Sequence, residues 1–418
     1  MENRGGLIPH VVVVGAGFAG LSAVSELQDA RVRITLVDRH TYATFQPLLY
    51  QVATAGLNPG DVVFPIRTLL RRMKNTTFRN GSIARVDHDA KRLIFDDDTE
   101  LPYDYLVLAI GATTNYFGVP GAAEFSHAIY TLDDALRVRN RLFFQLERVE
   151  ATGTGHGELT TVVVGGGATG VEMAGALAEL RANSLANDYK GVDPSAARVI
   201  LIEQQPRLLS VFDDRLSDYA RRELRKRGVE VRTDETVKEI GQNRVFLGSG
   251  EEIECGMVLW AAGVGVDRVI ADLGFPQGRG GRILVDNDLR ITGRNFEFAV
   301  GDVAAATTQD GSALLPQVAQ PAIQAGMHAA KQIKSLMTGG ETTEFQFKDK
   351  GIMATIGRHA AVVKLANGVD MTGGLAWFAW LILHLFTLLG FRNRLSVLLN
   401  WTWHYLSWRR GPRVILGG

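Results

Sequence analysis

Two stretches of this 418-residue chain follow the same order of valines and glycines. Residues 11–14 are four valines that lead into one glycine-rich turn, and residues 162–164 are three valines that lead into another. Short continuous runs of β-branched residues are typical of buried parallel strands. Helical sequence follows each turn, at residues 21–28 and 171–180. Strand, glycine turn and helix in this order predict two dinucleotide-binding folds in an α/β chain.

Each glycine of such a turn has its own role. The first permits the tight turn, the second lets a pyrophosphate approach the backbone, and the third lets the helix pack close to the strand. The N–H groups at the start of the helix then face the anion. The first turn contains Gly15, Gly17, Phe18, Ala19 and Gly20, and the second contains Gly165, Gly167, Ala168, Thr169 and Gly170.

An acid confirms each copy of the pattern. The strand after the first helix ends at Asp38, and the corresponding later strand ends at Glu203. A carboxylate there accepts the ribose hydroxyls of an adenosine and repels a 2′-phosphate. Two purely structural turns would not need this acid, so the pattern favours two bound dinucleotides.

Three further strand-and-turn segments belong to the same organisation. Residues 103–112 resemble residues 257–264, and each segment ends in a glycine turn, with Gly111 in the first and Gly263 in the second. We expect the chain to pass between domains at these turns. A third strand ends at Gly301 and Asp302 before a helical segment. All four residues are candidates for cofactor binding.

Composition excludes several classes of protein. Hydrophobic residues make up 46% and charged residues 22%, which is globular composition, and the net charge of zero gives no indication of a nucleic-acid partner. The single cysteine, Cys255, allows no disulfide and is expected to be buried. The histidines show no metal-ligand spacing, so no metal is expected. The N-terminus does not resemble a signal peptide, so a cytoplasmic location is expected.

Over residues 10–340 the chain resembles the two-dinucleotide-binding flavoprotein superfamily. The resemblance implies non-covalent FAD at the first turn and at Asp38, with Arg39 near the adenine and Asp302 near the ribityl or pyrophosphate group. It implies NADH at the second turn and at Glu203, because the two glutamines that follow Glu203 supply no cation for a 2′-phosphate. Hydride transfer between the two cofactors is the expected chemistry.

The reduced flavin needs an oxidant. Disulfide reductases and sulfide:quinone oxidoreductases of this superfamily use cysteines that the chain lacks. Quinone, oxygen, a ferredoxin and a haem protein remain as acceptors.

The C-terminal segment favours a lipid-soluble acceptor. Residues 371–418 contain no Asp, Glu or Lys, but they contain five arginines and five of the six tryptophans. The uncharged stretch 375–391 would form a helix about 26 Å long, shorter than a hydrocarbon core of roughly 30 Å. Residues 395–408 are apolar with polar interruptions. We expect two helices in the headgroup layer of an anionic bilayer; one spanning helix and an apolar dimer interface are the alternatives.

Four motifs resemble one family within the superfamily, the type II NADH dehydrogenases, which are single-subunit NADH:quinone oxidoreductases that do not pump protons. They are the segment after the first turn (residues 45–53), the second turn with its helix (165–175), the quinone motif (319–324) and the anchor (390–394). The resemblance implies a respiratory-chain enzyme that transfers a hydride from NADH to FAD and two electrons to menaquinone or ubiquinone. It also implies a peripheral position on the cytoplasmic face of a bacterial cell membrane.

The same resemblance indicates residues around the flavin and the quinone. Gln46 and Leu48 would contact the flavin, and Tyr50 and Gln51 are interpreted as packing of the flavin site. The quinone motif departs from the family pattern at Pro321, which leaves both of its glutamines in place.

Four residues are candidates for chemistry. Glu172 would orient the nicotinamide or quinone, or supply a proton to the quinol; the alternative is a first-turn carboxylate that caps its own helix. Gln320 and Gln324 would lie on one helix face beside the quinone carbonyls, with Gln317 as a weaker candidate. The alternative for these glutamines is helix N-terminal polarity beside FAD.

We expect three parts in the chain. They are an FAD domain at 1–120 and 281–340, an NADH domain at 121–280, and a C-terminal cap with an amphipathic anchor at 341–418. Two anchors in a homodimer would bind a membrane more strongly than one, but the sequence leaves the oligomeric state open. Two rival functions remain, a soluble ferredoxin or rubredoxin reductase and an apoptosis-inducing-factor-like flavoprotein with a binding role.

Overall fold

The computed structural model describes residues 8–153, 157–182, 188–193, 196–407 and 415. Trp408, Arg409, Arg410 and Arg413 of the predicted anchor lie outside the described residues. The chain forms two compact units. Unit 1 comprises residues 1–43, 64–113 and 264–349, and unit 2 comprises residues 44–63, 114–263 and 350–418.

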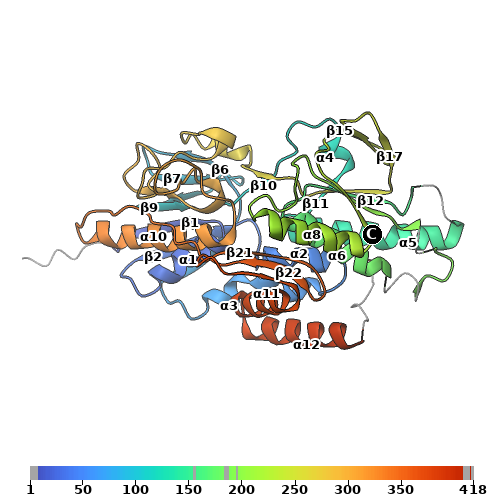
Figure 1. Ribbon diagram of the computed structural model, residues 1–418. Helices are drawn as coiled ribbons and strands as arrows, with labels where there is room; N and C mark the ends of the chain where they lie inside the picture. The colour runs from blue at the N-terminus through green and yellow to red at the C-terminus, as the bar shows by residue number, and fades with distance from the viewer. Residues whose placement is uncertain (1–7, 154–156, 183–187, 194–195, 408–414, 416–418) are drawn as a thin grey trace, which may run out of the picture. The chain divides into compact units, whose positions relative to one another are not determined.

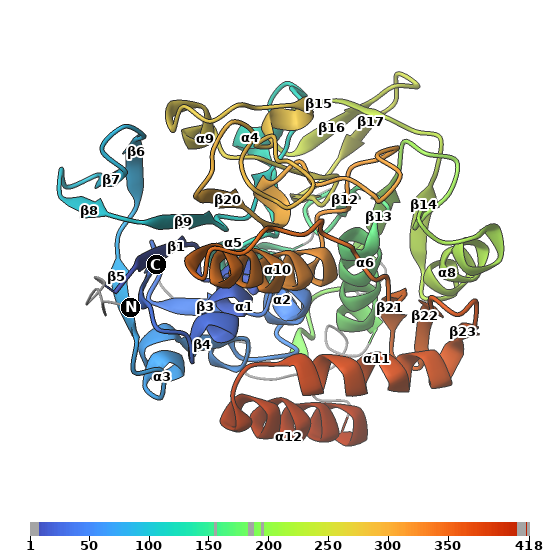
Figure 2. The same cartoon turned by 90° about the vertical axis from the view of Figure 1, so that its left-hand side faces the viewer.

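Unit 1 is built on a five-stranded parallel sheet in the order β20-β9-β1-β2-β5. The valines of β1 are completely or almost completely buried, as expected for a central parallel strand. Helices α1 and α10 pack against each other on this sheet (Figures 1 and 2). The strands are β1 (His10–Val14), β2 (Arg33–Asp38), β5 (Thr76–Asn80), β9 (Tyr105–Leu108) and β20 (Glu297–Ala299), and the helices are α1 (Phe18–Leu27), α3 (Ile66–Leu70), α9 (Val269–Asp272), η5 (Arg279–Gly281), η6 (Gly301–Val303) and α10 (Ala319–Met337).

A small antiparallel sheet completes unit 1. Its strands are β6 (Ile83–Asp87), β7 (Arg92–Phe95) and β8 (Glu100–Pro102). Side chains from this small sheet join the main core, where Leu93 and Phe95 pack with Val12 and Leu106. The core of unit 1 therefore covers one face of the nucleotide-binding sheet.

Unit 2 repeats the strand order of unit 1. Its parallel sheet has the order β11-β18-β12-β13-β14, in which β18, β12 and β13 correspond to β9, β1 and β2. The strands are β11 (His127–Ala128), β12 (Thr161–Val164), β13 (Val199–Ile202), β14 (Val229–Arg232) and β18 (Met257–Trp260), and the helices are α4 (Ala122–Phe125), α5 (Leu132–Thr152), α6 (Ala168–Leu180) and α8 (Asp214–Lys226). The duplicated sequence pattern thus corresponds to a duplicated fold.

Shorter elements complete unit 2. Two antiparallel sheets are formed by β15 (Val237–Gly241), β16 (Arg244–Leu247) and β17 (Glu252–Glu254), and by β21 (Ile352–Gly357), β22 (Ala360–Lys364) and β23 (Asp370–Thr372). The remaining helices are η1 (Gln46–Leu48), α2 (Leu49–Ala53), η2 (Pro59–Asp61), α11 (Gly373–Thr387) and α12 (Phe391–Ser407). Four short strands lie where the chain passes from one unit to the other: β3 (Tyr42–Thr44), β4 (Val63–Pro65), β10 (Thr113–Thr114) and β19 (Val264–Gly265).

The units divide the chain differently from the three predicted domains. Residues 264–280 belong to unit 1, whereas residues 44–63 and 350–418 belong to unit 2. The physical reason is packing: α2 lies against α5 and α6, and β21 lies against α6. Because α6 packs against both α2 and β21, residues 44–63 and the C-terminal segment 350–418 belong to the same unit as the second nucleotide fold.

The two C-terminal helices lie side by side (Figures 1 and 2). The first predicted helix, 375–391, is shorter than expected, because Gly390 adopts a left-handed conformation with φ of 78° and Phe391 begins α12. The 15 residues of α11 correspond to about 22 Å. Within the described part of the chain, no helix has both the length and the apolar character needed to cross a bilayer.

Candidate active site

The first glycine turn joins β1 to α1 in unit 1. Gly15 has φ of 104°, and a Cβ at Gly15 would overlap the carbonyl group of Ala109, the residue that follows β9. A Cβ at Gly20 would overlap the carbonyl oxygen of Gly15. A Cβ at Gly17 would meet nothing within 4 Å. The first and third glycines are therefore required by packing, and the second faces open space.

The second turn has the same geometry in unit 2. Gly165 has φ of 106°, and a Cβ there would overlap the backbone of Ala261 and Ala262. A Cβ at Gly170 would overlap the carbonyl group of Gly165. A Cβ at Gly167 would again meet nothing within 4 Å. The different roles assigned to the three glycines from the sequence fit both turns.

The acids at the ends of β2 and β13 are held by the turns. Asp38 accepts hydrogen bonds from the N–H groups of Ala16 (2.6 Å) and His40 (2.7 Å). Glu203 accepts them from Gly166 (2.5 Å) and Gln205 (2.7 Å). Each carboxylate is thereby fixed beside its glycine turn.

The helix starts suit a pyrophosphate. The N-cap residues are Gly17 in α1 and Gly167 in α6, which have no side chain to cap the helix, and neither helix has an acid in its first turn. Uncapped N–H groups and the helix dipole attract an anion. Together with the open space at the middle glycine, these features fit a dinucleotide in each unit.

The Gly301–Asp302 turn lies beside the first nucleotide turn within unit 1. A Cβ at Gly301 would lie 3.1 Å from the Cβ of Ala19, near the start of α1. Gln317 donates from Nε2 to the carbonyl oxygen of Asp302 at 3.0 Å. The structure therefore brings Gln317, Gly301 and Asp302 together near the start of α1.

The glutamines of α10 differ in their surroundings. Gln324 donates from Nε2 to the carbonyl oxygen of Lys348 at 2.9 Å, and its Oε1 accepts from the Lys348 N–H at 2.9 Å. The Gln324 amide thus holds a backbone segment, a role that the sequence did not indicate. Gln320 is half-buried near the start of the same helix.

The other predicted cofactor residues are distributed over both units. Arg39 is exposed after β2 in unit 1, and Gly111 there has φ of 74°. In unit 2, Leu48 is fully buried and Gln46 is half-buried in η1. Gly263 packs against the ring of Phe117.

Glu172 lies on α6 in unit 2, beyond the first turn of the helix. It accepts a hydrogen bond from the Thr355 N–H of β21 at 3.3 Å and one from the indole of Trp380 on α11. Both partners come from other elements, so the alternative of a carboxylate that caps its own helix is not what the structure shows. Burial raises the pKa of Glu172 from its ordinary value of 4.5 to about 8, against the lowering effect of the two hydrogen bonds.

Three side chains beside Glu172 form a directed chain of hydrogen bonds. Trp401 on α12 donates from Nε1 to Oε1 of Gln51 at 2.7 Å. Because indole can only donate, this contact fixes the Gln51 amide so that its Nε2 donates to the Tyr50 hydroxyl oxygen, at 2.8 Å. The Tyr50 hydroxyl therefore keeps its own proton for another acceptor.

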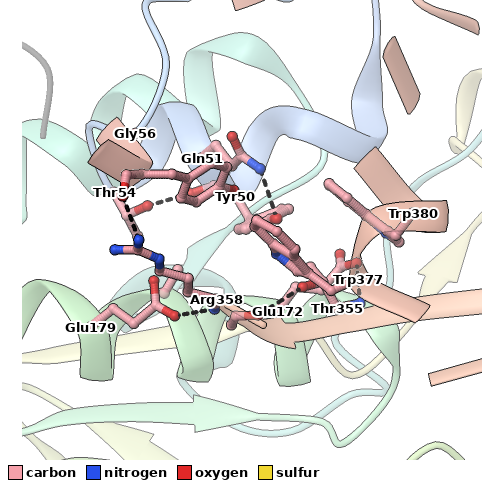
Figure 3. A pocket seen from close by; sticks show the side chains of 13 residues that line it. Tyr50, Gln51, Thr54, Gly56, Glu172, Glu179, Thr355, Arg358, Trp377 and Trp380 are labelled. Carbon is pink, nitrogen blue, oxygen red and sulfur yellow. Dashed lines mark hydrogen bonds between the residues drawn. The ribbon is translucent and has the colours of Figure 1, made fainter. Parts of the chain in front are cut away.

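Glu172, Tyr50 and Gln51 line a pocket of about 40 Å³ within unit 2 (Figure 3). Glu172 was predicted from the sequence, whereas Tyr50 and Gln51 were interpreted as packing of the flavin site. Glu179, Arg358 and Trp380 also line the pocket and were not predicted. The spacing of Glu172, Ala176 and Glu179 on one helix face was the available signal. Nothing local in the sequence indicated that β21 and α11 close the pocket.

Cys255 is 1% exposed, and burial raises the pKa of its thiol to about 12. The expectation of a buried apolar residue is confirmed. Among the residues that the structure describes, no group of three or more His, Cys, Asp or Glu side chains could hold a metal ion.

The duplicated sheet with a nucleotide turn in each unit defines a class, the dinucleotide-binding oxidoreductases. The family model described as pyridine nucleotide-disulphide oxidoreductase matches residues 9–326, and the model described as NDH2 C-terminal domain matches residues 350–410. The chain lacks the cysteine pair that disulfide chemistry requires.

Relatives identify the family within this class. The chain is 38% identical to the type II NADH:quinone oxidoreductase Ndh of Mycobacterium tuberculosis, over 97% of this chain and 90% of that protein. It is also 38% identical to NdhA of the same organism, over 97% and 89%. The NADH complex of NDH2 from Plasmodium falciparum has the same fold, with a TM-score of 0.90, 20% identity and coverage of 98% and 100%. The chain belongs to the type II NADH:quinone oxidoreductase family, and the resemblance predicted from the sequence is confirmed.

Proposed function

We propose that this chain oxidises NADH and reduces a membrane quinone without pumping protons. FAD, when bound, would supply the redox chemistry that connects NADH oxidation to quinone reduction. The observation that carries the proposal is the paired arrangement of glycine turn and acid, one in each unit. Two dinucleotide sites in one chain are what hydride transfer between NADH and a flavin requires.

The first turn and Asp38 would hold the FAD adenosine and pyrophosphate, and the second turn and Glu203 would hold NADH. Gly111, Gly301, Asp302, Arg39, Gln46, Leu48 and Gly263 remain proposed contacts of the cofactors. Glu203 uses its two oxygens toward the backbone of Gly166 and Gln205, which fixes the carboxylate for ribose hydroxyls. A fixed carboxylate that is followed by two glutamines also disfavours a 2′-phosphate, so NADH is the expected donor rather than NADPH.

Glu172 would supply a proton to the quinol. At neutral pH a carboxyl group with a pKa of about 8 is mostly protonated and can donate. Its hydrogen bonds to Thr355 and Trp380 orient the group. Gln320, Gln324 and Gln317 remain the proposed contacts of the quinone, and the amides of Gln317 and Gln324 also donate to backbone carbonyl groups.

We propose that α11 and α12 attach the protein to an anionic lipid surface. Both helices expose large apolar side chains, among them Leu375, Phe378, Phe386, Phe391, Leu399 and Trp403. Arg392 and Arg394, at the start of α12, would meet lipid headgroups. The cytoplasmic face of a bacterial membrane is the proposed location. A homodimer that covers part of this face is the alternative use of the same residues.

The test of the chemical proposal is a comparison of electron acceptors. We expect purified protein to oxidise NADH rapidly with a short-chain quinone, and we expect Glu172→Gln to reduce quinone turnover by about 10²-fold or more. Reduction of ferricyanide, which consumes no proton, should change little. In the wild type, quinone turnover should fall as the pH rises through about 8, because the donor form of Glu172 is lost.

Glu124→Gln, an exposed carboxylate of unit 2, is the matched control and should behave as the wild type. Absence of NADH:quinone turnover in the wild type would refute the enzyme. Unchanged quinone kinetics of Glu172→Gln at all pH values would refute its role as a proton donor.

A further inference from the structure

Unit 1 buries an arginine close to the Gly301–Asp302 turn. Arg282 is 8% exposed, although arginine is almost never buried unless its charge is paired. Its guanidinium donates from Nε to the carbonyl oxygen of Ala304 at 2.7 Å and from Nη1 to that of Leu315 at 3.1 Å. Both acceptors are backbone carbonyl groups, which carry no net charge. A buried cation in such surroundings is costly and calls for a compensating anion.

The backbone beside Arg282 is tied to the same turn. The Ile283 N–H donates to the carbonyl oxygen of Val303 at 2.8 Å, and the Ala305 N–H donates to that of Ile283 at 2.8 Å. The segment that carries Arg282 therefore runs alongside the residues that follow Asp302, and the place of the guanidinium is set by main-chain hydrogen bonds.

A second side chain holds the turn from the segment before α10. Gln317 donates from Nε2 to the carbonyl oxygen of Asp302 at 3.0 Å. Arg282 binds one carbonyl group in each of the same two segments, 302–304 and 315–317. The place of Asp302 beside the start of α1 therefore depends on both side chains.

The carboxylate of Asp302 is a charge that acts on Arg282. Burial lowers the pKa of Arg282, and the attraction of Asp302 opposes this effect. Arginine stays protonated in proteins, so the two side chains carry opposite charges. Asp302 is half-buried, so water and salt screen this attraction less than they would at the surface.

A carboxylate beside bound FAD has an electrostatic cost. The pyrophosphate of FAD is an anion, and the first nucleotide turn is built to receive it. Asp302, proposed to lie near the ribityl or pyrophosphate group, adds a further negative charge. Like charges in a partly buried site repel each other unless a cation compensates them. Arg282 can supply this cation from its place on the two carbonyl groups.

We propose that Arg282 is a positioning residue of the FAD site, which compensates the charge of Asp302 and fixes the turn that presents this carboxylate. The guanidinium need not contact FAD. With its charge compensated, Asp302 can accept hydrogen bonds from hydroxyl groups of FAD close to the pyrophosphate. The inference rests on the proposed assignment of FAD to the first turn and Asp302.

Release of FAD from the holoprotein tests this role independently of turnover. Gel filtration at timed intervals separates released FAD from the protein. Arg282→Met removes the charge and both donors, and we expect FAD release to become faster by about tenfold or more. Arg282→Lys keeps the charge without the fork of donors and should release FAD at an intermediate rate. Arg279→Met, at an exposed arginine three residues earlier, is the matched control and should release FAD as the wild type does.

The decisive variant combines Arg282→Met with Asp302→Asn. Asparagine removes the uncompensated charge and keeps an oxygen that can accept a hydrogen bond. We expect the double variant to release FAD more slowly than Arg282→Met alone, although Asp302→Asn by itself speeds release. Release from the double variant that is as fast as from Arg282→Met, or faster, would refute charge compensation, because independent structural losses add.

The inference and the proposed function fail in different ways. Wild-type FAD release from Arg282→Met would overturn the inference, while NADH:quinone turnover of the wild type would leave the proposed function intact. A wild-type protein that binds no FAD would refute the proposed function and the inference with it. Should Arg282→Met fail to fold, Arg282→Gln, which keeps an amide donor, takes its place in the same comparison with Asp302→Asn.

Discussion

Glu172 and Glu203 show how position within one unit determines what a carboxylate can do. Glu203 follows β13 and accepts hydrogen bonds from two backbone N–H groups, one of them from Gly166 in the glycine turn after β12. Glu172 lies among Tyr50, Thr355 and Trp380, where burial raises its pKa to about 8. Solvation, rather than residue type, separates the carboxylate proposed to bind ribose from the one proposed to exchange protons at neutral pH.

The raised pKa of Glu172 predicts a pH-dependent stability. The folded protein binds more protons than the unfolded chain between the ordinary pKa of 4.5 and the folded value of about 8, so this residue makes stability fall as the pH rises through that interval. Glutamine is neutral throughout. We expect the gain in Tm of Glu172→Gln over wild type to be larger at about pH 9 than at about pH 5. An equal Tm difference at both pH values, in thermal melts of the holoprotein, would contradict the shifted pKa.

Among the elements, α12 places three of its polar side chains on its docked face. Ser396 and Asn400 donate to the two carboxylate oxygens of Asp61 at 2.6 and 2.8 Å, and Asn393 donates to the Val63 carbonyl oxygen at 2.7 Å. The same helix exposes Phe391, Leu395, Leu398, Leu399 and Trp403, whereas Val397 and Trp401 are buried. Asn393, Ser396 and Asn400 therefore lie on the docked face of α12, and their hydrogen bonds hold the helix in place while its large apolar side chains remain exposed.

Helices α6 and α10 each pack so closely against a neighbouring element that only glycine fits at the contact. A Cβ at Gly326 of α10 would overlap the carbonyl oxygen of Ala19, and one at Gly175 of α6 would overlap that of Ile356 on β21. Gly374, near the start of α11, has nothing within 4 Å of an added Cβ. The same substitution, glycine to alanine, can therefore be compared between a closely packed position and an open one.

We expect Gly175→Ala to destabilise the protein by about 1–3 kcal/mol, because the added methyl group forces β21 away from α6. Gly374→Ala should raise stability by up to about 1 kcal/mol, because alanine is the better helix former. Chemical denaturation of both variants tests the pair. Equal effects would show that the contact with Ile356 does not limit the packing of α6.

For the whole molecule, the exposed face of α11 and α12 predicts membrane binding. Phe378, Phe386 and Phe391 are 58%, 68% and 80% exposed. Changing all three to serine should weaken binding to vesicles of phosphatidylglycerol and phosphatidylcholine by at least about tenfold, since each phenylalanine loses roughly 1.5–3 kcal/mol of burial when fully transferred. Flotation of the vesicles measures this binding, and turnover with a water-soluble quinone should be retained.

Phe144→Ser, at an exposed phenylalanine of α5, is the control and should leave flotation unchanged. Unchanged flotation of the triple variant, together with a shift from dimer to monomer, would instead assign the face to contact between copies of the chain. Truncation after Asp370 is a less specific test, because it also removes Trp380 and Trp401, which hydrogen-bond Glu172 and Gln51.

The sequence by itself determined the two nucleotide folds, because their signals are local. Valine runs, glycines at fixed spacing and the acid after the next strand are each set by backbone geometry within a short stretch of chain. The same locality identified Glu172 as a candidate and the C-terminal segment as an apolar helix pair.

Only the tertiary structure decided what surrounds those residues. Tyr50, Thr355 and Trp380, from α2, β21 and α11, line one pocket with Glu172. Trp401 of α12 binds Gln51 of the same pocket. The same folding gave Gln324 its partner at Lys348 and joined the C-terminal segment to the second unit. Contacts between segments more than a hundred residues apart depend on how buried faces fit, and no local pattern of the sequence records that fit.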